Sequence, residues 1–164
     1  MLFLSHDHTI SILPLVVKSL GFEPAKDFVA MAGFATFVNA LAVSGDTPTR
    51  SVNKYVARAR SQGNKGNVGV PAPASVPEFL VKVSDEKYKL DLAAAPYRGS
   101  APMMADMMGC LIGASVASVP DCIENHKAGK VRVVTVLGKA RQAAMPDVPT
   151  FIELGLVSFK DVPY

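Results

Sequence analysis

The sequence contains only two cysteines, Cys110 and Cys122, and no CxxC pair or cluster of histidines accompanies them. A structural zinc site needs several Cys and His ligands at close spacing, so the pattern argues against one. Because cysteine is among the residue types most often buried, we expect both to be free thiols in a core. The sequence leaves their redox state open. We expect no metal and no cofactor.

The chain also lacks an excess of one charge and lacks long apolar runs. Its 17 Lys+Arg and 14 Asp+Glu give a net charge of +3, and these charges are scattered, so no basic stripe predicts nucleic-acid binding. Pro, Lys, Asn or Gly interrupts each apolar run well before the roughly 18 residues of a membrane span. The apolar start, residues 1–4, meets polar residues 5–8 at once and is too short for a secretory signal. If the protein is exported, its signal lies outside this sequence.

The motifs of several enzyme classes are missing as well. No G-x-S-x-G elbow, no G-x-G-x-x-G fingerprint and no P-loop occurs, and Ser100 has no His or acid at a spacing that forces a triad. We therefore do not expect catalysis. A small serine hydrolase stays open as an alternative, because triads are assembled in space rather than in sequence.

What the chain does contain is typical of one globular domain of α/β class. It has 164 residues, of which 49% are hydrophobic, and from Ser44 onward helical and strand-like segments alternate, as in parallel βαβ units. A helix is predicted from Val52 to a stop at Gly63, and a second opens at Ser75. On the second helix, Phe79, Leu80 and Val83 are expected to face inward. The remaining expectations are strands at 67–70, 90–95, 112–117 and 131–137 and helices at 101–108, 121–127 and 150–155.

The first forty or so residues follow a different pattern. We predict a strand at 2–5, a short helix at 10–19 that contains Pro14, and two strands within 28–43 that bend near 33–36. This segment has no obvious closing partner. The chain is thus expected to be a piece of something longer.

Several stretches together resemble the Bug (TctC) family, the extracytoplasmic substrate-binding proteins of tripartite tricarboxylate transporters. The matching stretches are HDHT at 6–9, AKDFVAMAGFATF at 25–37, YRGSAP at 97–102, HKAGKVRVV at 126–134 and PDVPTFIELG at 146–155. The last two are specific in combination, and the order and spacing of all five match the family across nearly the whole chain.

The resemblance implies a two-lobed, periplasmic-binding-protein-like fold of type II that closes on a small carboxylate. Residues 1–43 would be a remnant of the first lobe, 44–156 the second lobe, and 157–164 a segment that crosses back toward the first lobe. The implied location is the periplasm, and the implied partners are the transporter's membrane subunits. The ligand would be a di- or tricarboxylate, an acidic amino acid or an aromatic acid. Its identity does not transfer, because Ala117 and Ser118 stand where relatives often have Asp-Asn.

The candidate ligand site consists of two helix starts, where backbone N–H groups lack intrahelical acceptors and the helix dipole favours an anion. One is formed by Gly99, Ser100 and Ala101, with the Ser100 hydroxyl as a further donor. The other follows the strand at 67–70, at the edge of the sheet where open α/β folds bind ligands. The site is assigned to Ala74, Ser75, Val76, Gly99, Ser100, Ala101, His8 and Thr9.

Simpler roles stand beside these assignments. Ser75 and Ser100 are also ordinary N-caps, and Arg98 is expected to be a solvated cation. His6 and His8 have no third ligand nearby and are expected to cap or pack. The methionines of the helix at 101–108 are expected to fill the core.

A different class of function also fits the architecture. The effector-binding domain of a transcription regulator shares the two-lobed fold, although it would follow a helix-turn-helix that this sequence does not contain. Because about half of the binding pincer is absent, we expect the chain to bind carboxylates poorly or not at all.

Overall fold

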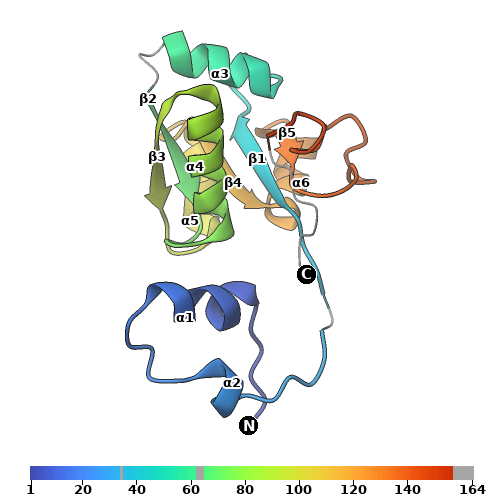
Figure 1. Cartoon of the computed structure of the whole chain (residues 1–164). Helices are drawn as coiled ribbons and strands as arrows, with labels where there is room; N and C mark the ends of the chain where they lie inside the picture. The colour runs from blue at the N-terminus through green and yellow to red at the C-terminus, as the bar shows by residue number, and fades with distance from the viewer. Residues whose placement is uncertain (34, 62–64, 157–164) are drawn as a thin grey trace.

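The computed structural model describes residues 1–33, 35–61 and 65–156, and a five-stranded sheet forms its centre (Figure 1). The strand order is β3-β2-β4-β1-β5. β2 is parallel to β3 and to β4, whereas β1 is antiparallel to both of its neighbours, β4 and β5. The sheet is therefore parallel except for one inner strand. The strands are β1 (Asn39–Ser44), β2 (Lys65–Val70), β3 (Asp91–Pro96), β4 (Ala114–Ser118) and β5 (Val131–Val136).

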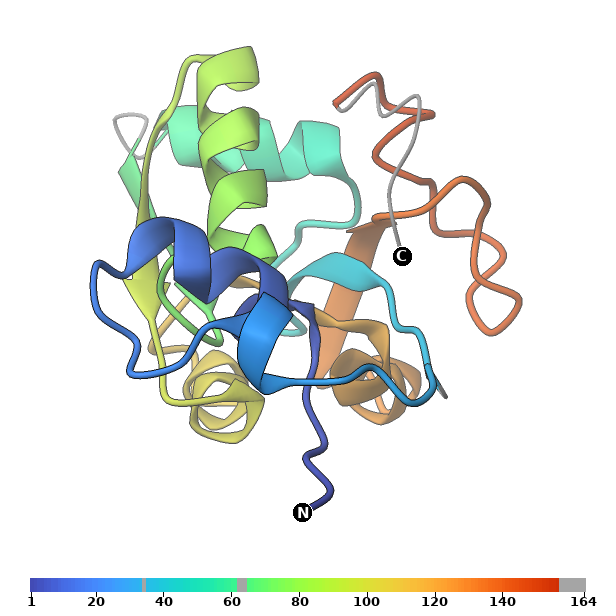
Figure 2. The ribbon, with the colours of Figure 1, turned by 60° about the horizontal axis from the view of Figure 1, so that its bottom comes forward.

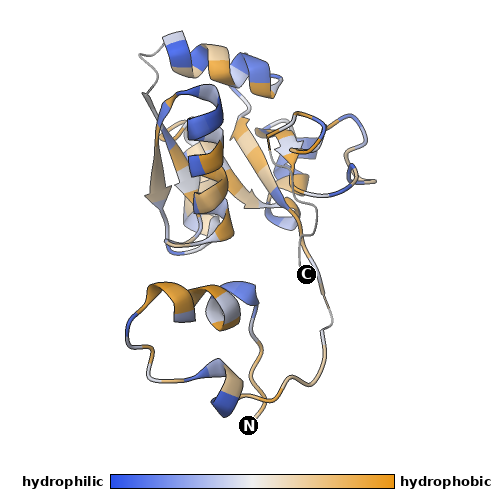
Figure 3. Ribbon diagram, in the orientation of Figure 1, coloured by the Kyte–Doolittle hydropathy of each residue, from blue (hydrophilic) through white to orange (hydrophobic). Residues whose placement is uncertain are grey.

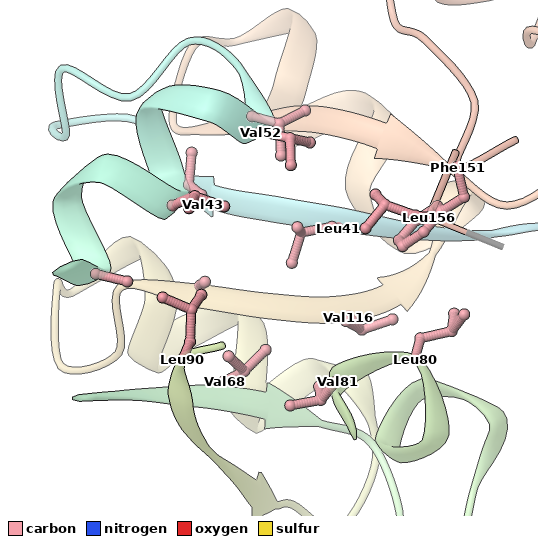
Figure 4. Packing of buried hydrophobic residues seen from close by; sticks show 14 of the residues in the cluster. Leu41, Val43, Val52, Val68, Leu80, Val81, Leu90, Val116, Phe151 and Leu156 are labelled. Atoms are coloured by element: carbon pink, nitrogen blue, oxygen red, sulfur yellow. The ribbon is translucent and has the colours of Figure 1, made fainter. Parts of the chain in front are cut away.

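Helices cover both faces of the sheet and bury two separate apolar clusters. On one face α3 (Val52–Ser61) and α4 (Val76–Tyr88) pack over strand residues such as Leu41 and Val43 (Figure 4). On the other face α5 (Ser100–Met108) and α6 (Val119–Lys127) pack over the alternate strand positions. Successive residues of a strand point to opposite faces, so strands covered on both sides are apolar throughout. Figure 3 shows this as the nearly continuous hydrophobic colour of β1.

The α/β expectation is confirmed, and most helices and strands lie close to their predicted ranges. Details of burial differ. Phe79 was expected to face inward but is 54% exposed, because the side of α4 that meets the sheet carries Leu80 and Val81 instead. Met108 is exposed as well, whereas the other methionines of α5 are buried as predicted. The predicted stop at Gly63 lies outside the described residues.

The described residues of the stretch 28–43, which exclude residue 34, do not form the two predicted strands. Only β1 forms, and it pairs on both sides with strands of the sheet. The predicted boundary between a remnant at 1–43 and a lobe at 44–156 therefore falls inside β1, and residues 39–43 belong to the sheet. Apolar composition alone did not show which part of the stretch has neighbouring strands to pair with. The predicted crossing segment at 157–164 lies outside the described residues.

The N-terminal segment contains short helices: η1 (His8–Ile12), a π-helix, α1 (Leu13–Val16) and α2 (Pro24–Asp27). None of the three buries a residue, and residues 2–5 form no strand. The segment lies below the carboxyl ends of β2 and β3 in Figure 1 and passes in front of them in Figure 2. Large apolar side chains remain exposed along it, among them Leu2, Leu4, Leu15, Val29 and Met31.

The predicted helix at 150–155 is wrong, since residues 151–155 form turns and no helix. The Thr150 amide donates to Glu153 Oε2 at 2.7 Å, and the Glu153 amide donates to Thr150 Oγ1 at 3.0 Å, which is the reciprocal pattern of a capping box. Gly155 then adopts a φ of +60°, a left-handed conformation that ends a helix at little cost. The start and stop signals are therefore both present, but they are too close together for a helix to form between them.

None of the described helices is long and apolar enough to cross a bilayer.

Candidate functional site

The predicted site residues gather at one edge of the sheet. β2 and β3 are adjacent and parallel, and β4 runs beside β2 in the same direction. Their carboxyl ends therefore lie together, and α4, α5 and α6 each begin there, directly after β2, β3 and β4. The positive ends of helix dipoles thus meet at a single edge.

Two donors of the loop between β2 and α4 are bound within the loop and the start of α4. The Ala74 amide donates to Glu78 Oε2 at 2.7 Å, and the Ser75 hydroxyl donates to the Ala72 carbonyl at 2.6 Å. Lys82 Nζ lies 3.0 Å from Glu78 Oε1. The hydrogen bond from Lys82, followed by the one from Ala74, lowers the pKa of Glu78. A carboxylate of the protein therefore already occupies the start of α4.

The loop between β3 and α5 is tied to the first loop. Gly99 has a φ of +100°, which glycine adopts readily, and its amide donates to the Pro71 carbonyl at 2.9 Å. Hence neither the Gly99 amide nor the Ala74 amide is free to bind an acid. Ser100 and Ala101 are the first residues of α5, where backbone N–H groups have no intrahelical acceptor.

The Ser100 hydroxyl also has a partner that the sequence analysis missed. It donates to Asp121 Oδ2 at 2.7 Å, and the Ser118 hydroxyl donates to the same oxygen at 2.7 Å. Ser118 and Asp121 form an S-x-x-D pattern at the start of α6, which is a recognisable capping signal. The link from Ser100 to Asp121 crosses between helices, and no local pattern predicts it.

The N-terminal segment reaches the same edge through its π-helix. His8 Nε2 lies 3.2 Å from the Pro73 carbonyl, within hydrogen-bond distance, so His8 sits against the loop that precedes α4. The Thr9 amide donates to the His6 carbonyl within its own turn. The structure thus places the predicted residues close together, and the first backbone N–H groups of α5, whose own first turn contains no acidic residue, are the candidate donors. Whether they bind a ligand stays a prediction.

A cavity of about 190 Å³ lies at the opposite edge of the sheet and contains none of the predicted residues. Thr47, Tyr55 and Cys110 are among the residues that line it. Cys110 was expected to be a core thiol but is exposed, with its thiol donating to Asp46 Oδ2 at 3.3 Å. Cys122 is buried and free, as predicted. Within the described ranges, no group of three or more His, Cys, Asp and Glu side chains is arranged to hold a metal ion.

An open sheet that is parallel except for β1, with helices on both faces and helix starts gathered at one edge, defines the chain as an α/β lobe of the periplasmic-binding-protein type. The profile of the TctC family, described as "Tripartite tricarboxylate transporter family receptor", matches residues 2–163. The chain belongs to this family, which confirms the resemblance found in the sequence.

Curated relatives agree with this assignment. The chain is 27% identical over 152 residues to "UPF0065 protein in gbd 5'region" of Cupriavidus necator, a match that covers 93% of this chain and 46% of the relative. It is 22% identical over 155 residues to "Protein BugT" of Bordetella pertussis, covering 94% of this chain and 46% of that protein. The chain therefore spans about half the length of the curated relatives it matches.

Solved structures show the same fold. The structure of R. palustris Rpa4515 with adipate superposes with a TM-score of 0.85 at 25% identity, covering 94% of this chain and 52% of that chain. A structure described as a periplasmic transporter gives a TM-score of 0.82 at 27% identity, covering 90% of this chain and 50% of that chain. The TctC family and the fold that these structures share with the chain are those of solute-binding proteins.

Proposed function

We propose that this chain supplies part of the ligand site of an extracytoplasmic receptor, which captures a small carboxylate in the periplasm and delivers it to the membrane subunits of a tripartite tricarboxylate-type transporter. Membership of the TctC family supports this proposal. So does the gathering of helix starts at one sheet edge, since backbone N–H groups there favour anions without a buried cation.

The observation that carries the proposal is a difference among the helix starts. The first turn of α4 contains Glu78 and that of α6 contains Asp121, whereas the first turn of α5 contains no acidic residue. A ligand carboxylate is therefore bound best at the start of α5, by the backbone N–H groups of Ser100 and Ala101. Hydrogen bonds to a charged acceptor contribute about 1.5 to 3 kcal/mol each.

We propose no catalytic role for Ser100. A nucleophilic serine needs a base that takes its proton, usually an imidazole. The Ser100 hydroxyl instead donates to the carboxylate of Asp121, an arrangement that fixes the loop. Binding without chemistry is what a solute receptor requires.

Affinity is the first test. The chain spans about half of its relatives, so the opposing half of a closing site is not supplied by these residues. Titration calorimetry with succinate, citrate and L-aspartate is expected to show no micromolar binding. A micromolar dissociation constant would contradict this half-site interpretation.

Amide NMR of the same chain provides the second test, because it detects millimolar binding. At least one of these acids is expected to shift the Ala101 amide signal. Ser100→Ala should keep this response, since it removes only a hydroxyl that Asp121 already engages. Ser100→Pro should weaken it, because proline is tolerated at the first helical position but removes one of the two N–H donors. A response that disappears in Ser100→Ala but persists in Ser100→Pro would refute the backbone site.

A further inference from the structure

Asp121 lies exposed between the starts of α5 and α6, and only one of its two carboxylate oxygens accepts hydrogen bonds from the described residues. The hydroxyls of Ser100 and Ser118 both donate to Oδ2, each at 2.7 Å. Within the described part of the chain, no side chain or amide donates to Oδ1. An ionised carboxylate accepts several hydrogen bonds on each oxygen. One oxygen of Asp121 is therefore used by the protein, and the other is available.

The charge of Asp121 is close to the proposed carboxylate site. Ser100 contributes both its hydroxyl, which bonds Asp121, and its backbone N–H at the start of α5, so the two sites are one side chain apart. Glu78, the acidic residue in the first turn of α4, pairs with Lys82 at 3.0 Å. Among the described residues, no Lys, Arg or His forms such a pair with Asp121.

This geometry penalises a plain carboxylate. An acid bound at the N–H groups of Ser100 and Ala101 brings its negative charge next to the carboxylate of Asp121, and two neighbouring negative charges repel each other. A hydrogen-bond donor on the carbon next to the ligand's carboxylate would offset this repulsion by donating to Asp121 Oδ1, while the carboxylate accepts from the helix start. An ammonium group also cancels the charge.

We infer that Asp121 is a specificity-determining residue that selects acids carrying an amino or hydroxyl group on the carbon next to a carboxylate. The inference rests on the proposed function, since it assumes that an acid binds at the start of α5. It narrows the ligand class from small carboxylates in general to 2-amino and 2-hydroxy acids. Ser100 and Ser118 act as positioning residues that hold the carboxylate of Asp121 in place.

The test compares three acids of the same length on the 164-residue chain by amide NMR: succinate, L-malate and L-aspartate. In the unchanged protein, L-aspartate and L-malate are expected to bind about tenfold or more tightly than succinate, as judged from the Ser100 and Ala101 amide shifts. Asp121→Asn keeps the shape and an oxygen that accepts from the serines but removes the charge. It should bring the three affinities to within about twofold to threefold.

Glu124→Gln is the matched control. Glu124 lies on the same helix, is exposed and pairs with Lys127 at 3.0 Å, so this variant removes an equal charge away from the edge. It should leave the preference unchanged, and thermal unfolding of each variant checks that the fold is retained.

The outcomes separate the two proposals. Equal binding of succinate and L-aspartate to the unchanged chain, or a preference that survives Asp121→Asn, overturns the role of Asp121 while leaving the carboxylate site intact. If no acid shifts the Ser100 or Ala101 amides in any variant, the proposed carboxylate site itself is wrong, and the selection with it.

Discussion

Gly45, at the end of β1, is a position where one added carbon should be very costly. Its amide donates to the Lys130 carbonyl at 2.9 Å. A Cβ built on Gly45 would overlap the carbonyl oxygen of Gly129 and would lie 2.8 Å from the carbonyl carbon and oxygen of Lys130. These are backbone atoms of the turn that leads into β5, so no side-chain rotation relieves the contact.

Gly45→Ala should therefore separate the end of β1 from β5. Overpacking costs roughly 1 to 3 kcal/mol, and the loss of the amide hydrogen bond adds about 1 to 3 kcal/mol where the groups stay buried. We expect a total loss of about 2 to 6 kcal/mol. Domains of this size are stable by only about 5 to 15 kcal/mol, so the variant should unfold at a much lower urea concentration.

Two other glycines provide matched controls for the same experiment. A Cβ on Gly69 would lie 2.7 Å from Ile112 Cδ1 and 2.8 Å from Met103 Cγ, which are side-chain atoms that can shift. Gly69→Ala should cost about 1 to 2 kcal/mol. A Cβ on Gly113 meets no atom within 4 Å, so Gly113→Ala should change stability by less than about 0.5 kcal/mol.

Equilibrium urea unfolding, followed by circular dichroism, measures the three differences. The order Gly45→Ala, Gly69→Ala, Gly113→Ala, from most to least destabilised, is the expected result. A Gly45→Ala protein within about 1 kcal/mol of the parent chain would show that the turn before β5 moves freely, and would refute the backbone-contact reasoning.

Two further substitutions test one partly buried and one fully buried polar side chain. Burial, and next the charge of Arg132, lowers the pKa of His126 below 6.5, and its Nδ1 accepts from the Val133 amide at 3.2 Å. As the pH falls, the unfolded chain therefore takes up this proton before the folded chain does, and the free energy of unfolding should decrease below about pH 6.5. His126→Gln should make the free energy of unfolding depend less steeply on pH in this range. An unchanged pH dependence would contradict the role of His126. The Thr135 hydroxyl is fully buried and has no hydrogen-bond partner among the described residues, so Thr135→Val should raise stability by about 1 kcal/mol and Thr135→Ser should not, as melting temperatures will show.

The sequence was sufficient to predict the elements that have a strong local pattern. Val52, Val56 and Ala59 follow the period of a helix, and all three are buried on α3. The β-branched run at β5 predicts a strand covered on both faces, and nearly all of its residues are buried. In these segments the pattern of apolar residues and the tertiary contacts agree.

The prediction for the N-terminal segment was wrong at 28–43, where contacts with other strands rather than the local sequence pattern determine the structure. Residues 28–43 are mostly apolar, yet among the described residues of this stretch only those from Asn39 onward form a strand, because there β4 and β5 offer pairing partners. Strand propensity describes how well a residue fits a pleated, half-buried surface. It does not show whether such a surface exists beside it.

The candidate site shows the same division within a few residues. Ser118 and Asp121 are three positions apart, in an S-x-x-D pattern that marks a helix start in the sequence, and their side chains bond to each other rather than to the backbone. Ser100 and Asp121 are 21 positions apart and meet only because α5 and α6 pack side by side on one face of the sheet (Figure 2). That packing changes the role of the Ser100 hydroxyl. In the sequence it is a donor available to an acid, whereas in the fold it donates to a carboxylate of the protein. The backbone N–H groups beside it are the donors that we propose for a ligand.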